Sequence, residues 1–479
     1  AQEFNDVKLL VKHSAHLSPR SDVFNTMHIV VNTIAGSVLE IDLEKKNTIL
    51  DIKDIVANTW GIPPRCQQLI LNSVILQDSD TLGASYPDGA PKSLTMAISV
   101  EGIHKEMRSG TKFEKMSALD DVCKLGKRGG VYALQAVIHG ILDKDRGVRS
   151  KCMDALRFMA FTLRDDPDAM DVICGMLDDS RHVSAGLEAL ASAGTTGNPR
   201  AIAALGGLIE KTSMPVGFTE KEALLVAVRT LSQVAERGNA VAIDVLCGRL
   251  ADLDAEVRLF VVTGLSSIAN KGNERVRLAM IRCLQDGDDD VSHAAVSTLK
   301  GVVERGDVQT IMDIRNAMRA PEDSSQICAS MLALAHISER GEEQTVSLIS
   351  AHLDDSHSDV RYSALRALEV VGAPSDTAII APVSRCLQDV DGDVRHAAVK
   401  ALARIAGKSN TDAVAALNIC LDDAKEMVRR AAREALAKYY EKDDGANEPV
   451  AERSVSSPSQ PPGCLERVQS HLSALQGWW

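Results

Sequence analysis

A chain of 479 residues has room for roughly two or three compact domains or for one long array, and its 45% apolar residues are ample for burial. The net charge of -13, from 53 Lys and Arg against 66 Asp and Glu, creates no long-range positive field for nucleic acid or anionic lipid. We therefore expect neither nucleic acid nor a membrane as partner, although a local basic strip is compatible with this balance. The aromatic content of 3% favours closely packed helices over a β-sandwich.

The ten cysteines are scattered without a CxxC pair. Cys283, Cys386 and Cys420 each stand directly before a leucine that recurs in the later part of the chain. Because reduced cysteine is among the most buried residue types, this register predicts core residues rather than metal ligands or redox groups. We expect no cofactor and no metal, and a reducing compartment, the cytoplasm or the nucleus.

Residues 1–24 are polar and irregular, and we expect a flexible leader. Apolar residues then alternate from Met27 to Val31, a turn follows at Ala35, and alternation resumes at Val38. This pattern predicts a β-hairpin.

A helix is expected next, because Thr48 is placed to cap a run of apolar residues with helical spacing. Gly61 and the prolines at 63 and 64 end it. Further strands are predicted at "QQLILN", at "VILQ" and at "SLTMAISV".

This order of elements resembles ubiquitin from residue 27 to about residue 98. The resemblance implies a β-grasp domain over residues 25–100. The matching residues are Met27, Ile29 and Val31 in the first strand, Thr33 to Gly36 in the turn, Thr48, Ile49 and Lys53 in the helix, "GIPP" at 61–64, "QQLI" at 67–70, and Leu76, Asp78, Thr81 and Leu82.

The chain departs from ubiquitin after the last strand, where "VEGIHKEM" replaces a free Gly-Gly tail, so we expect no conjugation without cleavage. Ubiquitin binds partners through an exposed apolar spot. The resemblance places Ile34, Ile70, Thr95 and Ala97 at the corresponding positions. Two interpretations stay open: a protein-binding patch, or scattered exposed apolar residues of the ordinary kind.

After the β-grasp segment a six-residue spacing, Asp followed by Val-Arg, recurs mostly at intervals of 34 residues or a small multiple of it. Glycines, and later serines, mark the joints between helices with a similar period at 238, 272, 306, 341, 375 and 409. A helical hairpin is therefore the repeating unit. The pairs are Asp143 with Arg149, Asp252 with Arg258, Asp355 with Arg361, Asp389 with Arg395, and Asp423 with Arg429.

These units resemble HEAT repeats, most closely the short subclass found in phycobiliprotein lyases. The resemblance implies that the Asp and Arg residues form a structural ladder between adjacent units. We expect it to weaken at Asp286, where Ser292 replaces the Arg, and near Pro321. The predicted fold is a multidomain chain: the β-grasp ubiquitin-like domain, a linker at 101–112 and an all-α solenoid of about nine units at 113–440.

The remaining tail divides into two predicted parts. Residues 441–463 are rich in acidic residues, Ser, Pro and Gly, and we expect a disordered linker. In residues 464–479, Leu465, Val468, Leu472 and Leu475 have helical spacing. Both a short amphipathic docking helix and an unstructured terminus with incidental periodicity fit that segment.

Sequence motifs for catalysis are absent. No P-loop, Rossmann glycine pattern, nucleophile elbow or zinc spacing occurs, and no His precedes a Glu, as the iron-binding HEAT hydroxylases would require. We therefore expect a non-enzymatic adaptor, with the ubiquitin-like module docking to a ubiquitin-pathway partner and the solenoid binding a second protein. The alternatives are a bilin-lyase-like enzyme or an accessory subunit of one, and a pure scaffold in which Ile34 and Ile70 are buried against Phe113.

Overall fold

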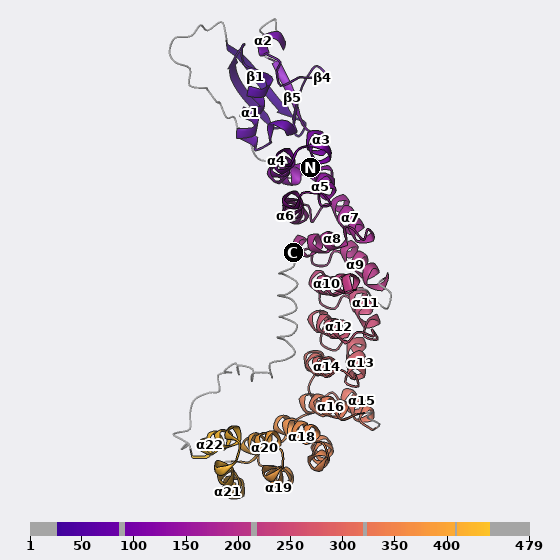
Figure 1. Cartoon of the computed structure of the whole chain (residues 1–479), viewed down its shortest axis with the longest axis vertical. Helices are drawn as coiled ribbons and strands as arrows, with labels where there is room; N and C mark the ends of the chain where they lie inside the picture. Colours follow the sequence, from indigo (N-terminus) through magenta and orange to yellow (C-terminus); the bar gives the residue numbers. More distant parts are fainter. Residues whose placement is uncertain (1–25, 86–91, 212–217, 320–322, 408–409, 441–479) are drawn as a thin grey trace. The chain divides into compact units, whose positions relative to one another are not determined.

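The computed structural model describes residues 26–85, 92–211, 218–319, 323–407 and 410–440 (Figure 1). Its contacts divide the chain into two compact units, residues 1–211 and residues 212–479. The predicted leader at 1–24 and the predicted segments 441–463 and 464–479 lie outside the described residues. The β-grasp domain and the helical repeats are both confirmed.

The first unit begins with a five-stranded sheet in the order β2-β1-β5-β3-β4. The pairing of β1 with β5 is parallel, and the other three pairings are antiparallel. The alternating residues Met27, Ile29 and Val31 are buried, as the pattern predicts. The strands are β1 (Thr26–Thr33), β2 (Val38–Glu44), β3 (Gln67–Leu71), β4 (Val74–Ile75) and β5 (Lys92–Ile98).

Helix α1 (Ile49–Trp60) follows the hairpin and buries Ile49, Ile52 and Val56. Thr48 caps its first turn, with a reciprocal bond from the Thr48 backbone N–H to the Asp51 carboxylate. Gly61 ends the helix with φ of 68°, a conformation that glycine adopts without steric cost. Short helical turns follow at η1 (Pro64–Cys66) and α2 (Leu82–Ser85).

The linker predicted at 101–112 is wrong, because helix α3 (Glu101–Ser109) occupies most of it. Its residues Ile103 and Met107 are buried at i and i+4 spacing, which the sequence already contained as a helical signal. Helix α4 (Lys112–Leu125) begins directly afterwards with Thr111 and Glu114 as a capping box. The helical region therefore starts at Glu101 rather than at residue 113.

The rest of the first unit is a series of helices with short connections. They are α5 (Gly130–Gly140), α6 (Arg146–Thr162), α7 (Pro167–Gly175), α8 (Val183–Ala193) and α9 (Pro199–Lys211), with 3-10 turns η2 (Gly126–Gly129) and η3 (Met176–Asp178).

The second unit continues the helical hairpins. Its helices are α10 (Phe218–Val234), α11 (Ala240–Gly248), α12 (Ala255–Ile268), α13 (Glu274–Cys283), α14 (Asp289–Val302), α15 (Val308–Ala317), α16 (Ser324–Ile337), α17 (Glu343–Ser350), α18 (Ser358–Val371), α19 (Thr377–Arg385), α20 (Gly392–Ile405), α21 (Thr411–Ile419) and α22 (Glu426–Tyr440), with 3-10 turns η4 (Ala351–Asp354), η5 (Cys386–Gln388) and η6 (Cys420–Asp422).

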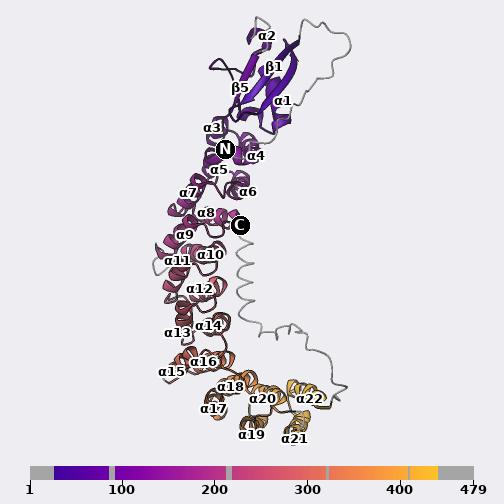
Figure 2. The ribbon, with the colours of Figure 1, turned by 180° about the vertical axis from the view of Figure 1, so that it is seen from behind.

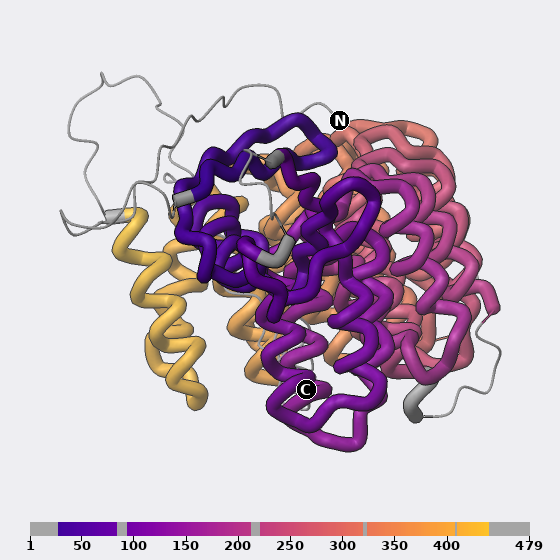
Figure 3. Tube along the Cα trace, turned by 90° about the horizontal axis from the view of Figure 1, so that it is seen from above, coloured from indigo at the N-terminus to yellow at the C-terminus, as the bar shows by residue number. Residues whose placement is uncertain are grey.

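Within this second unit the even-numbered helices pack in one layer and the odd-numbered helices in another, as both side views show (Figures 1 and 2). Seen along the stack, the hairpins of residues 240–337 lie over one another (Figure 3). Cys283, Cys386 and Cys420 are buried between the layers, as their register predicts. Each hairpin therefore buries its apolar face mainly against its neighbours in sequence.

A backbone ladder joins the hairpins of the second unit at the joints. The N–H of each joint residue donates to a carbonyl at the end of the next even-numbered helix, at 2.6–2.7 Å. The glycines at these joints have positive φ, and Ser375 takes the same conformation at φ of 65°. The bonds run from Gly238 to Ile268, Gly272 to Val302, Gly306 to Ile337, Gly341 to Val371, and Ser375 to Ile405.

Candidate functional site

The outer face of the β-grasp sheet carries three of the predicted patch residues. Ile70 in β3 lies directly opposite Thr95 in β5, and Ala97 follows two residues later on the same face. Thr95 is exposed, whereas Ile70 and Ala97 are half-buried. Ile34 lies in the turn after β1 and is 79% exposed. The predicted patch residues are therefore accessible.

Two further apolar residues extend this face, and the sequence analysis missed them. Ile75 in β4 pairs with Ile70, and Val38 in β2 pairs with Asn32, which itself lies beside Thr95. Both side chains are exposed. Each directly precedes a buried leucine, and because side chains alternate between the two faces of a strand, this neighbour was the sequence signal that could have placed them on the outer face. The sheet face is defined from here on as Ile34, Val38, Ile70, Ile75, Thr95 and Ala97.

A different end of the β-grasp domain contacts the first helices through Arg65. Its Nε lies 2.7 Å from Asp121 Oδ2, its Nη2 donates to Ser117 Oγ at 2.9 Å, and it pairs with Glu106. The Asp121 side chain is only 9% exposed. Arg65 therefore connects the domain to both α3 and α4.

Backbone groups strengthen the same junction. Arg128 donates to the carbonyl of Trp60 at 2.5 Å across this junction. Behind it, His104 of α3 lies in hydrogen-bond contact with the carbonyl of Tyr132 in α5 at 2.8 Å, which holds α3 to the next helices. Burial raises the pKa of the Cys66 thiol, next to Arg65, to about 12.

Phe113 is 82% exposed, so it does not bury Ile34 as the pure-scaffold alternative requires.

In the second unit, three of the predicted arginines bridge adjacent hairpins. Each binds the aspartate that lies 28 residues further along the chain with two parallel hydrogen bonds of 2.7–2.9 Å. The same arginine also donates to the backbone carbonyl of the aspartate six residues before it. The side-chain pairs are Arg258 with Asp286, Arg361 with Asp389, and Arg395 with Asp423.

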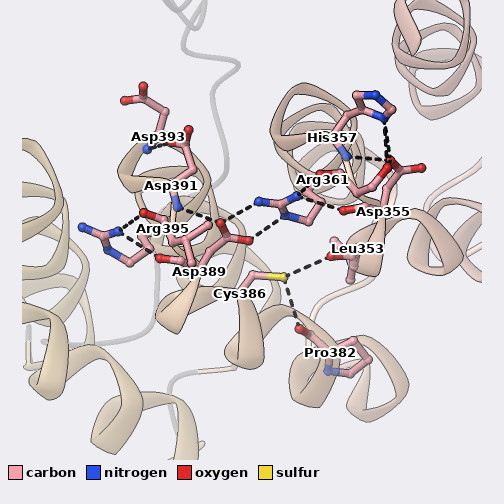
Figure 4. A network of polar contacts seen from close by, with 12 residues as sticks. Leu353, Asp355, His357, Arg361, Pro382, Cys386, Asp389, Asp391, Asp393 and Arg395 are labelled. Carbon is pink, nitrogen blue, oxygen red and sulfur yellow. Dashed lines mark hydrogen bonds and ion pairs between the residues drawn. The ribbon is translucent and has the colours of Figure 1, made fainter. Parts of the chain in front are cut away.

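Figure 4 shows the step between Arg361 and Asp389, with Asp355 before it and Arg395 after it. Arg361 reaches the carboxylate of Asp389, whose other contacts include the N–H of Asp391 at 2.8 Å. Because Arg361 donates to it, the pKa of Asp389 lies below its ordinary value, and Arg395 does the same to Asp423. These charged pairs thus act between units and not between the Asp and Arg that are six residues apart.

Among the other predicted ladder residues, Asp143 is bridged across 28 residues by a lysine, and the rest make local contacts. Lys115 takes the arginine's role toward Asp143 at 2.5 Å, while Arg149 donates to the Asp143 and Lys144 carbonyls. Asp252 pairs with Arg249 in its own turn. The Asp355 carboxylate accepts from the N–H of His357, and Arg429 in α22 pairs with Glu426.

The ladder is interrupted between α14 and α18, where the sequence predicts a weak point. Ser292 occupies the arginine position in α14 and is buried. Ile327 occupies it in α16, and the preceding residue, Gln326, donates back to the carbonyl of Gln285 at 3.2 Å. The backbone ladder nevertheless continues through these same units, which explains why the stack remains regular without the charged pairs.

Groups suited to chemistry are scarce in the described ranges. No cluster of three or more His, Cys, Asp or Glu residues there could hold a metal ion. The nine described cysteines are free. Among the described helices, none is long and apolar enough to cross a membrane.

Two family models match the chain. The model of the ubiquitin family matches residues 29–95, which cover the β-grasp sheet and α1. The model of HEAT repeats matches residues 345–437, which cover the hairpins from α17 to α22. The chain therefore contains a ubiquitin-like domain followed by HEAT repeats, two domain types that typically mediate protein interactions and are typically non-catalytic.

Proposed function

We propose that this protein is a non-enzymatic adaptor. Its ubiquitin-like domain docks to a ubiquitin-binding domain of a ubiquitin-pathway protein, and its HEAT solenoid binds a second protein. One observation carries the proposal: the domain attaches to α3 and α4 through Arg65, while the sheet face remains exposed. A domain that served only to cap the array would gain nothing from leaving apolar residues such as Ile34 and Ile75 in water.

The sheet face exposes a row of apolar side chains. Ile34, Val38 and Ile75 are 79%, 47% and 49% exposed, and the strand register places Val38 and Ile75 in one row with Ile70 and Thr95. Asn32 and Thr95 lie between Val38 and Ile70 in this row, so the face combines exposed apolar side chains with polar ones. Such a mixed surface is typical of a small protein-binding site, in which a few central side chains supply most of the affinity.

The test uses the full-length chain and a panel of purified ubiquitin-binding domains, with binding measured by isothermal titration calorimetry. We expect at least one domain to bind, and Ile70→Ala to weaken that binding by roughly tenfold, the effect of about 1.4 kcal/mol at a central contact. Leu50→Ala is the matched control, because Leu50 is an exposed apolar residue of α1 and lies outside the sheet face.

Absence of binding to the whole panel would contradict the proposal for the ubiquitin-like domain. If Ile70→Ala and Leu50→Ala lost binding affinity equally, the binding site would not be the sheet face. Unfolding midpoints of both variants show whether each retains the wild-type fold.

A further inference from the structure

The second unit contains a hollow of about 660 Å³ where several consecutive helices end. It lies at the C-terminal ends of α14, α16, α18 and α20 and at the joints that follow α12, α14 and α16. The ends of the even-numbered helices thus meet a set of joint residues. The lining residues are Lys271, Lys300, Val303, Glu304, Arg305, His336, Ile337, Arg340, Glu369, Val370 and Arg404.

Cations dominate this lining, with five Lys and Arg residues against two glutamates. Lys300, Arg340 and Arg404 are exposed and have no ion-pair partner among the described residues. Lys271 pairs with Glu304 at 3.1 Å, but both side chains are more than half exposed, so this pair compensates little charge. The hollow therefore has an excess of uncompensated positive charge in a chain whose net charge is -13.

Helix ends alone do not account for these cations. Positive side chains are favoured in the last turn of a helix, where carbonyl oxygens lack partners. Here the joint residues already donate to such carbonyls, from Gly306 to Ile337 and from Gly341 to Val371. Because the backbone ladder already supplies hydrogen-bond donors to some of these carbonyl oxygens, the cationic side chains stay available to a ligand.

His336 lies in the hollow among these cations. It is half-buried in the hollow, and it makes no hydrogen bond among the described residues. Burial, followed by the charges of Lys300, Arg305 and Arg366, lowers the pKa of His336 to about 4. The imidazole is therefore neutral near pH 7, and a positive potential surrounds it.

The floor of the hollow is apolar. Val303 and Ile337 are buried, and Val370 is half-buried beside them. No Phe, Tyr or Trp lines the hollow in the described part of the chain, so it lacks the large aromatic side chains on which single-stranded nucleic acid stacks. An apolar floor with cations at the rim fits a peptide that presents both carboxylates and aliphatic side chains.

We propose that this hollow binds an acidic segment of a partner protein, with aliphatic side chains on the floor and Asp or Glu carboxylates on Lys300, Arg340 and Arg404. The inference rests on the proposed adaptor function and names the chemistry of the solenoid's partner. It does not depend on the sheet face of the ubiquitin-like domain, which lies in the other unit.

The test measures the fluorescence anisotropy of a labelled peptide of about 12 residues. Its Leu residues recur at helical spacing on one face, and Glu and Asp occupy the adjacent positions. The full-length chain is titrated into this probe and into a control peptide with Gln and Asn in place of the acids. We expect the acidic probe to bind at least about tenfold more tightly than its control, and its affinity to fall as salt is raised.

Charge reversal identifies the site. Lys300→Glu with Arg340→Glu should reduce affinity for the acidic probe at least about tenfold. Arg282→Glu with Lys438→Glu is the matched control, because both residues are exposed and lie outside the hollow. The milder pair Lys300→Gln and Arg340→Gln keeps the test decisive if the charge-reversed chain fails to fold.

The proposal would be overturned if the acidic probe failed to bind, if the neutral peptide bound equally well, or if the Arg282 and Lys438 control lost as much affinity. It would also be overturned if a single-stranded oligonucleotide bound more tightly than the acidic probe. Tighter binding of a peptide that spans residues 441–463 would assign the hollow to the chain itself and would also overturn it. Ile70→Ala should leave binding of the acidic probe unchanged, which separates this outcome from failure of the ubiquitin-like patch.

Discussion

Arg65 and Asp121 connect the ubiquitin-like domain to the helical region, with Arg65 Nε 2.7 Å from Asp121 Oδ2. The carboxylate is almost buried, and Arg65 also binds Ser117 and Glu106. A charge-assisted network of this kind orients two domains more strictly than a flexible linker would.

The first prediction concerns this junction. Arg65→Ala should increase amide hydrogen exchange in residues 112–121 and in η1, because the Asp121 carboxylate loses its partner in the ubiquitin-like domain. Exchange in β1 and β2 should stay as in the wild type. Arg108→Ala is the control, since Arg108 is an exposed residue of α3 without a side-chain partner in the described residues. Unchanged exchange in both variants would show that Arg65 does not hold the junction.

The second prediction concerns the charged ladder. Arg361→Gln should lower the free energy of unfolding by about 2 kcal/mol, because the mostly buried Asp389 loses a two-bond partner. Arg385→Gln should change it by less than about 0.5 kcal/mol, since the Arg385 pair with Asp354 is exposed on both sides. Urea denaturation followed by circular dichroism measures both. Similar midpoints for the two variants would contradict the role assigned to Arg361.

The third prediction concerns acid stability. Arg361 lowers the pKa of Asp389, so the folded chain releases this proton more readily than the unfolded chain. The resulting stabilisation is complete above the ordinary Asp pKa of about 3.9 and is lost as pH falls through the lower folded pKa. Wild type should therefore lose stability more steeply than Arg361→Gln between about pH 5 and pH 2. Parallel curves in urea titrations would rule this linkage out.

The fourth prediction compares two equivalent joints. Ser375 has φ of 65° where the four joints before it, from Gly238 to Gly341, have glycine, so Ser375→Gly should stabilise the chain by about 0.5 kcal/mol. Gly272 has φ of 76°, and no atom lies within 4 Å of the position that an added Cβ would take. Gly272→Ala should therefore destabilise the chain by about 1 kcal/mol through backbone strain alone. Thermal unfolding midpoints should shift in opposite directions. Shifts of the same sign would show that the joint conformation is not what decides stability there.

Much of the fold was visible in the sequence, because its signals are local or periodic. Thr48 and Gly61 mark the ends of α1 through capping and positive φ, which depend on a few neighbouring residues. The glycine joints and the buried Cys386 and Cys420 follow from a repeat that places each residue type at one position of the hairpin. The helix α3 was missed although Ile103 and Met107 have helical spacing, because nine residues between two domains also fit a linker.

The partners of the predicted site residues depended on the tertiary structure. The sequence indicates that an Asp and an Arg six residues apart matter, but the arginine's side chain binds the aspartate of the next hairpin, which only the stacking of the units brings near. For the same reason the row from Val38 to Ile75 follows from strand register, and the junction at Arg65 and Asp121 from the packing of a sheet domain on two helices. Local patterns determined the elements, whereas contacts between residues distant in the chain determined the surfaces, because those contacts exist only once the elements have packed.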